Sequence, residues 1–131
     1  MENHEFENLI NEAVMALPKH IQDKLSNVSI VLEEGESPDN ALFGLYHGVS
    51  KLHRGSSYGM GPTLPDKITI WKGTIEKFAS PQTPEVDPVA YESAVRSLVR
   101  KVVWHEIGHH LGFDEEGIRK LETKCEEEGK V

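Results

Sequence analysis

The chain has 131 residues, of which 37% are hydrophobic and 27% charged, a composition typical of a folded globular protein rather than a disordered one. The length suits a single domain spanning residues 1–131. The formal net charge is −8 at pH 7, and the sequence has no cluster of Lys and Arg. Because binding to phosphate backbones requires clustered cations, we expect no nucleic-acid partner.

Secretion and membrane insertion are also disfavoured. Cys125 is the single cysteine, so the chain cannot form an intramolecular disulfide. The polar, acidic start, Met1-Glu2-Asn3, is unlike a secretion signal, and no apolar run is long enough to cross a bilayer. We therefore expect a cytoplasmic protein with no membrane partner.

The first third of the chain predicts a helix and two strands. Apolar residues at helical spacing predict an amphipathic helix over residues 3–17, which Pro18 ends, with a short further turn near Ile21. A β-branched run predicts a strand over residues 28–32, and residues 44–49 form a second candidate strand.

A long loop precedes a third predicted strand. Residues 54–66 are rich in Gly, Ser and Pro, and long loops in compact domains often carry function. Residues 67–71 predict the strand, residues 74–79 a short helix, and residues 80–84 a connector.

A long capped helix is the clearest predicted element. Asp87 followed by Pro88 is a strong helix start, because the carboxylate caps the backbone and proline fits the first helical position. Gly112 follows the pattern where a left-handed residue commonly ends a helix. Between these ends, one helical stripe combines apolar side chains with two histidines, all of which we expect to face the core. The stripe consists of Tyr91, Val95, Leu98, Val102, His105 and His109.

A final helix is indicated by Ile118, Leu121 and Cys125, which recur at spacings of three and four. The order of a helix, then strands, then a long helix predicts an α+β fold. We expect a small mixed β-sheet packed on the long helix.

Residues 105–109 read His-Glu-Ile-Gly-His and contain the pattern H-E-x-x-H. Four residues are slightly more than one helical turn, so His105 and His109 project from one face and can bind one zinc ion. Glu106 points about 100° away from His105, beside the metal. There it can accept a proton from a zinc-activated water and pass it to the departing amine. The motif predicts a zinc metallopeptidase with Glu106 as general base.

A third metal ligand is expected after the helix, because catalytic zinc sites generally use three protein ligands and leave one position for water. Glu115 lies six residues after His109, beyond the turn that Gly112 permits. We predict Glu115 as the ligand, with Asp114, Glu116 or water as alternatives. The other interpretation of these acidic residues is that they only cap the last helix.

His110 follows His109 directly and so points off the ligand face. We favour a role in the core or in support of the metal ligands. Four further side chains can donate to a developing oxyanion, although each also fits an ordinary surface or packing role. They are Tyr46, His47, His53 and Tyr58.

The chain resembles a small bacterial family named "possible zinc metallopeptidase", which has a minimal zincin-like domain. The resemblance runs from about Phe6 to Leu121 and is carried by residues 44–48, 61–62, 64–68 and 105–112. It implies a zincin-like fold, in which a small sheet lies above the active-site helix. The family typically has Asp at the position that Glu115 holds here.

The resemblance also implies how a substrate binds. Zincins generally bind a peptide or protein substrate extended beside an exposed sheet edge. Residues 44–49 are the candidate edge, because their flanking glycines let a peptide backbone approach closely. The identity of the substrate and the oligomeric state stay open.

Two alternative functions compete with the peptidase. The pattern of His105, His109 and Glu115 partly resembles a bacterial rRNA-maturation endoribonuclease family, which has glycine in place of Glu106 and histidine in place of Glu115. The acidic charge also argues against RNA. The second alternative is a non-enzymatic interaction module that keeps the fold without turnover.

Overall fold

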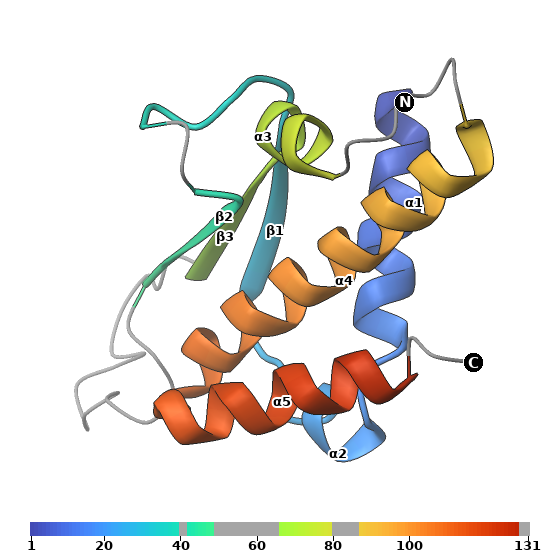
Figure 1. Ribbon diagram of the computed structural model, residues 1–131. Coiled ribbons are helices and arrows are strands. Elements are labelled where there is room, and N and C mark those ends of the chain that lie inside the picture. Colours follow the sequence, from blue (N-terminus) through green and yellow to red (C-terminus); the bar gives the residue numbers. More distant parts are fainter. Residues whose placement is uncertain (40–41, 49–65, 80–86, 129–131) are drawn as a thin grey trace.

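The computed structural model describes residues 1–39, 42–48, 66–79 and 87–128. A small sheet lies beside the long helix α4, with the remaining helices around them (Figure 1). The α+β prediction is confirmed. The elements in chain order are α1 (Asn3–Met15), α2 (Lys19–Gln22), β1 (Val28–Glu33), β2 (Gly44–His47), β3 (Asp66–Trp71), α3 (Lys72–Phe78), α4 (Pro88–Leu111) and α5 (Glu115–Glu128).

Among the residues that the structure describes, the sheet is mixed and has three strands in the order β1-β3-β2. β1 pairs with β3 in parallel, and β2 pairs with β3 in the antiparallel direction. The central strand β3 carries Ile68 and Ile70, whose side chains are fully buried. β2 is therefore an edge strand of this sheet.

The long helix begins and ends where its capping residues predict. The Asp87 side chain accepts a hydrogen bond from the Ala90 backbone N–H at 3.0 Å, and Pro88 takes the first helical position. Gly112 adopts a left-handed conformation, with φ of 82°, and ends the helix. Both ends of α4 are confirmed.

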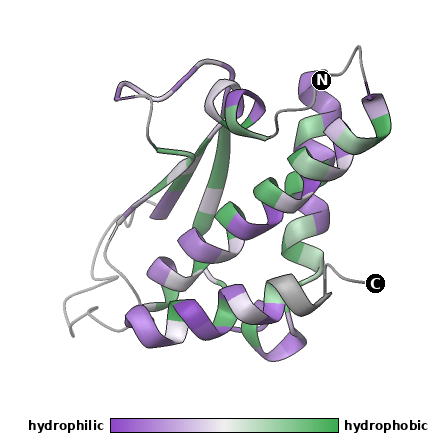
Figure 2. Cartoon of the chain, viewed as in Figure 1, coloured by the Kyte–Doolittle hydropathy of each residue, from purple (hydrophilic) through white to green (hydrophobic). Residues whose placement is uncertain are grey.

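α4 packs against α1, α5 and the strands β2 and β3. Trp104 is fully buried, and its indole N–H donates to the backbone carbonyl of Ala13 on α1 at 2.8 Å. Figure 2 shows hydrophobic residues along β1 and mostly hydrophilic ones along α5. The buried face of α1 consists of Phe6, Leu9, Ile10 and Ala13.

Several boundaries differ from the predictions. The first helix ends at Met15, and Leu17 is buried just beyond it. Asp66 does not belong to the long loop: it begins β3, pairs in register with Val28 and is buried. The rest of that loop, with His53 and Tyr58, and the predicted connector at residues 80–84 lie outside the described residues.

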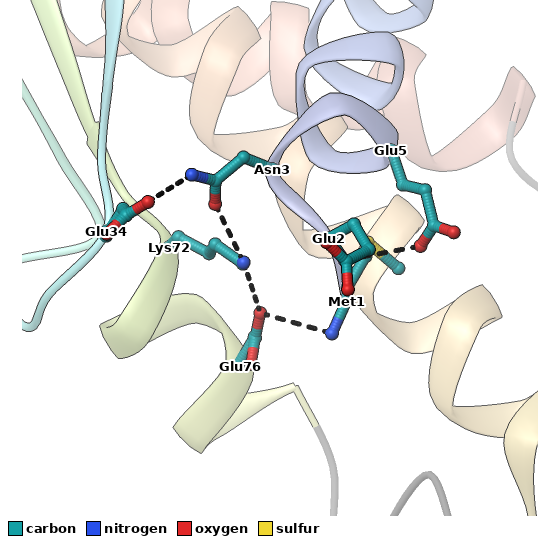
Figure 3. A network of polar contacts seen from close by, with 7 residues as sticks. All are labelled: Met1, Glu2, Asn3, Glu5, Glu34, Lys72 and Glu76. Carbon is teal, nitrogen blue, oxygen red and sulfur yellow. Dashed lines mark hydrogen bonds and ion pairs between the residues drawn. The ribbon is translucent and has the colours of Figure 1, made fainter.

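Polar contacts tie the start of α1 to α3 and to the segment after β1 (Figure 3). Lys72 donates to the Asn3 side chain at 2.9 Å, and Asn3 also contacts Glu34.

No helix in the described part of the chain is both long and apolar enough to span a membrane.

Candidate metal and catalytic site

The two motif histidines lie one turn apart near the C-terminal end of α4. The Nε2 atoms of His105 and His109 are 3.1 Å apart, and their rings meet edge to face. Two nitrogens bound at about 2.0–2.1 Å to one tetrahedral zinc ion lie roughly 3.3 Å apart. The pair therefore already converges as two ligands of one zinc ion would.

Glu122 on α5 orients the first histidine. Its Oε1 is 2.5 Å from Nδ1 of His105, the ring nitrogen opposite the one that faces His109. A carboxylate on the second ring nitrogen of a metal-binding histidine fixes the tautomer and the direction of the ring. Sequence reasoning missed Glu122, because it lies in an acidic helix where every carboxylate looks like part of a solvated face.

The expectation that both histidines face the core is wrong. The His105 side chain is 39% exposed and His109 is exposed, whereas Glu106 and His110 are buried. The physical reason is that β2, β3 and α5 pack against this end of α4: Glu106 is bonded to β2, His110 is bonded to β3, and Gly108 lies against α5. The residues turned towards the core are Glu106, the general-base candidate, and His110. His105 and His109 are accessible to solvent.

Glu106 lies in a mostly buried environment beside the two histidines. Burial raises the pKa of its carboxyl above the usual range, and this outweighs the lowering effects of His105, His109 and a hydrogen bond from the Tyr46 backbone. A general base works best when its pKa approaches the working pH. The carboxyl of Glu106 is shifted in that direction.

A mainly apolar pocket of about 280 Å³ opens beside these residues. Its apolar walls come from the chain entering β2 and from α4, and His105, Glu106 and Glu122 also line it. A larger cavity of about 650 Å³ between α1 and β1 includes none of these three residues. The apolar wall residues are Leu42, Phe43, Leu98 and Val102.

The edge strand β2 lies beside the part of α4 that carries the motif. A Cβ at Gly44 would come within 2.8 Å of Val102 Cγ1, so glycine is needed for the strand to approach α4 this closely. The Trp71 backbone N–H bonds the Phe43 carbonyl at 3.0 Å. Because bonding alternates along an antiparallel pair, the backbone groups of Gly44 and Tyr46 point away from β3. The predicted position of this segment, at a sheet edge near His105, is confirmed for residues 44–47 of the described sheet, although Gly44 itself is buried.

His110 is fully buried behind the motif and is paired with Asp66. Its Nδ1 lies 2.8 Å from Asp66 Oδ2, and the Tyr46 hydroxyl donates to the same oxygen at 2.7 Å. The prediction of a core or supporting role for His110 is thus confirmed. From the sequence alone, Asp66 falls in the Pro-rich loop and has no assigned role, because that position gives no sign of burial.

The predicted third ligand, Glu115, is exposed at the first residue of α5. Among the residues that the structure describes, no group of three His, Cys, Asp or Glu side chains is arranged to hold a metal ion. Asp114 accepts a hydrogen bond from the Gly117 backbone, as a helix cap does, and Glu116 pairs with Lys120. Glu115 stays a prediction.

Comparison with protein families agrees with this geometry. A family model described as zincin-like metallopeptidase matches residues 20–125. No curated protein matches the chain. The match covers most of the sequence and includes the sheet, α4 with its motif, and most of α5. The chain belongs to the zincin-like metallopeptidase family.

Proposed function

We propose that the protein is a zinc-dependent metallopeptidase that hydrolyses peptide bonds, with His105 and His109 as metal ligands and Glu106 as general base. The observation that carries the proposal is the convergence of the two Nε2 atoms, 3.1 Å apart, beside a buried carboxyl. When bound, zinc acts as a Lewis acid that polarises a carbonyl and makes water a better nucleophile near neutral pH.

Glu106 performs the proton transfers. Its carboxylate accepts a proton from the attacking water, and the resulting acid donates that proton to the nitrogen of the departing amine. Burial keeps bulk water away from the carboxyl, and the Tyr46 backbone hydrogen bond holds it in place. His105 and His109 are not needed for this transfer and remain free to hold the metal.

The substrate is a peptide in extended conformation along β2. The outward backbone groups of Gly44 and the outward carbonyl of Tyr46 offer the strand-like pairing by which extended peptides add to a sheet edge, while the Tyr46 N–H bonds Glu106. The neighbouring pocket of about 280 Å³ has four apolar side chains in its wall, and it fits an apolar side chain of that peptide.

Glu115 is proposed as the third ligand, because an anionic oxygen would balance part of the ion's charge beside two neutral imidazoles. Zinc affinity should fall sharply in Glu115→Ala and little in Asp114→Ala or Glu116→Ala, as measured by competition with a chromophoric chelator. A larger loss in Asp114→Ala or Glu116→Ala would move the ligand there. No loss in any of the three variants would indicate two histidines completed by water.

The decisive experiment replaces Glu106 with glutamine in zinc-loaded protein. Glu106→Gln should keep its zinc, since Glu106 is not a ligand, and should lose about a hundredfold or more in peptide hydrolysis. Glu92→Gln is the matched control, because Glu92 is exposed on the same helix. A broad library of unstructured peptides, read by mass spectrometry, supplies the substrates.

Two outcomes would contradict the proposal. Equal cleavage by the wild-type protein and Glu106→Gln would assign the activity to a contaminant or to another mechanism. No cleavage of any peptide by zinc-loaded wild-type protein would favour the non-enzymatic interaction module.

A further inference from the structure

A polar unit lies behind the motif and is formed by the half-buried Tyr46 on β2 and the buried Asp66 on β3 and His110 on α4. We propose that Asp66 and His110 are positioning residues that act through Tyr46 to hold the Glu106 carboxylate in place. The inference rests on the proposed function, in which Glu106 is the general base.

The hydrogen bonds within the unit fix the role of each member. Asp66 Oδ2 is 2.8 Å from His110 Nδ1 and 2.7 Å from the Tyr46 hydroxyl. An ionised carboxylate only accepts hydrogen bonds, so the imidazole N–H and the hydroxyl both donate to it. Asp66 therefore joins the edge strand to the C-terminal part of α4.

Two of the three members are almost fully buried, which leaves their side chains little freedom. Asp66 is 3% exposed and His110 is fully buried, and burying a charge is tolerated only where it is hydrogen-bonded. The Tyr46 ring also packs edge to face against the His110 ring, with centroids 6.0 Å apart. At Gly48, just after β2, a Cβ would lie 2.4 Å from Asp66 Oδ1, so only glycine lets the chain pass this close.

Tyr46 is connected to α4 at two points. Its backbone bonds Glu106, and its side chain is held at His110 through Asp66. Glu106 and His110 are four residues apart, so they lie on the same face of the helix, one turn from each other. With both points fixed, Tyr46 cannot rotate or slide without moving its backbone N–H away from the Glu106 carboxylate.

Within the described sheet, the edge strand β2 has few other interactions that hold it in place. β2 has four residues and pairs with one neighbour in the described sheet. Short edge segments open most easily in a folded protein. The bonds to Asp66 add a side-chain anchor at the residue whose backbone reaches the general base.

The first test uses Tyr46→Phe, which removes the hydroxyl and keeps the ring. Backbone amide exchange, measured by NMR on the full chain, should become at least tenfold faster at residue 46 and change little at the amides of β3. Lys67→Gln is the matched control, because Lys67 follows Asp66 on β3 and is exposed. Unchanged exchange at residue 46 in Tyr46→Phe would overturn the proposal.

The second test separates positioning from general stability. In zinc-loaded protein, kcat for peptide hydrolysis should fall about tenfold or more in Tyr46→Phe, while KM and zinc content stay within about twofold, because small misplacements of a catalytic group are costly. Unchanged kcat in that variant would overturn the proposal, as would a parallel rise in KM and loss of zinc.

A rescue pair at His110 completes the design. Asn places its amide nitrogen close to the position of the imidazole Nδ1, so His110→Asn should retain most of the protection at residue 46, whereas His110→Leu should lose it. Equal exchange in the two variants would overturn the role of the His110–Asp66 bond. If wild-type protein cleaves no peptide, the proposed function fails, and the exchange measurements still decide whether the unit holds Tyr46.

Discussion

Two groups of polar contacts, at opposite ends of β3, join distant parts of the chain in different ways. The N-terminal cluster lies beyond the carboxyl end of the strand, where the start of α1 meets α3 (Figure 3). It is built from flexible side chains and the terminal amine, with ion pairs of 3.8 Å from Lys72 and Met1 to Glu76. Its members are Met1, Asn3, Glu34, Lys72 and Glu76.

The motif cluster lies at the amino end of β3 and around the end of α4. Its contacts join imidazole rings to carboxylates, at 2.5 Å between His105 and Glu122 and 2.8 Å between His110 and Asp66. Imidazole rings have few torsions, and the His110–Asp66 pair is almost wholly buried. Its members are Tyr46, Asp66, His105, His110 and Glu122.

The comparison shows that hydrogen bonds and ion pairs of similar chemistry can either add stability or orient a functional side chain. Long side chains in partial contact with water gain little energy and fix no direction, because solvent screens them and their rotamers cost entropy. Rigid rings bonded to buried or half-buried carboxylates fix a direction, which is what a metal ligand and a general base require. We expect the N-terminal cluster to affect stability alone and the motif cluster to affect metal and catalysis.

The largest effect is expected at the histidines themselves. His105→Ala and His109→Ala should each abolish stoichiometric zinc, which we expect at about one ion per chain, because two imidazoles on one helix face form the core of the site. Elemental analysis after dialysis measures this. His20→Ala is the control, since His20 is exposed on α2. Undiminished zinc in both motif variants would refute the assignment.

Glu122→Ala should come next, with zinc affinity about 10-fold to 100-fold lower, because loss of the carboxylate frees the His105 ring to rotate. Competition with a chelator gives the affinity. Glu76→Ala is the counterpart in the N-terminal cluster and should leave zinc affinity unchanged. Equal affinities in the two variants would mean that Glu122 does not orient the ligand.

Glu106 should show a stability effect whose sign depends on pH. Burial raises the pKa of its carboxyl, so the folded chain binds this proton more tightly than the unfolded chain does. In metal-free protein the wild type should therefore lose stability relative to Glu106→Gln as pH rises from about 4.3, the usual value for glutamate, through the raised pKa. Urea unfolding across this range measures the difference, with Glu92→Gln as control. If the wild type instead lost stability relative to Glu106→Gln as the pH fell, the sign would be reversed and the burial argument would be contradicted.

The smallest effect is expected in the N-terminal cluster. Lys72→Met should lower the free energy of unfolding by about 1 kcal/mol through loss of the bond to Asn3 and the pair with Glu76, without change in zinc content. Lys120→Met removes an exposed pair with Glu116 and should cost close to nothing. Chemical denaturation compares the two variants. A loss of zinc in Lys72→Met would erase the distinction between the clusters.

Features that depend on residues close together in the chain could be predicted from the sequence. Asp87, Pro88 and Gly112 fixed both ends of α4, because capping and left-handed geometry depend on neighbours along the chain. The four-residue spacing of His105 and His109 predicted their convergence, since a helix places such residues on one face. The β-branched runs likewise located β1 and β3 to within a residue at either end.

Only the tertiary structure decided which side of the motif is buried and what supports it. The stripe through His105 and His109 looked core-facing, yet Glu106 and His110 are the buried pair, because burial depends on how β2, β3 and α5 meet around the helix. Asp66 and Glu122 lie 44 and 17 residues from their histidine partners. A carboxylate in a loop or on an acidic helix has no local pattern that marks such a partner. The sequence thus determines the residues of the motif, and long-range packing determines which carboxylates orient them.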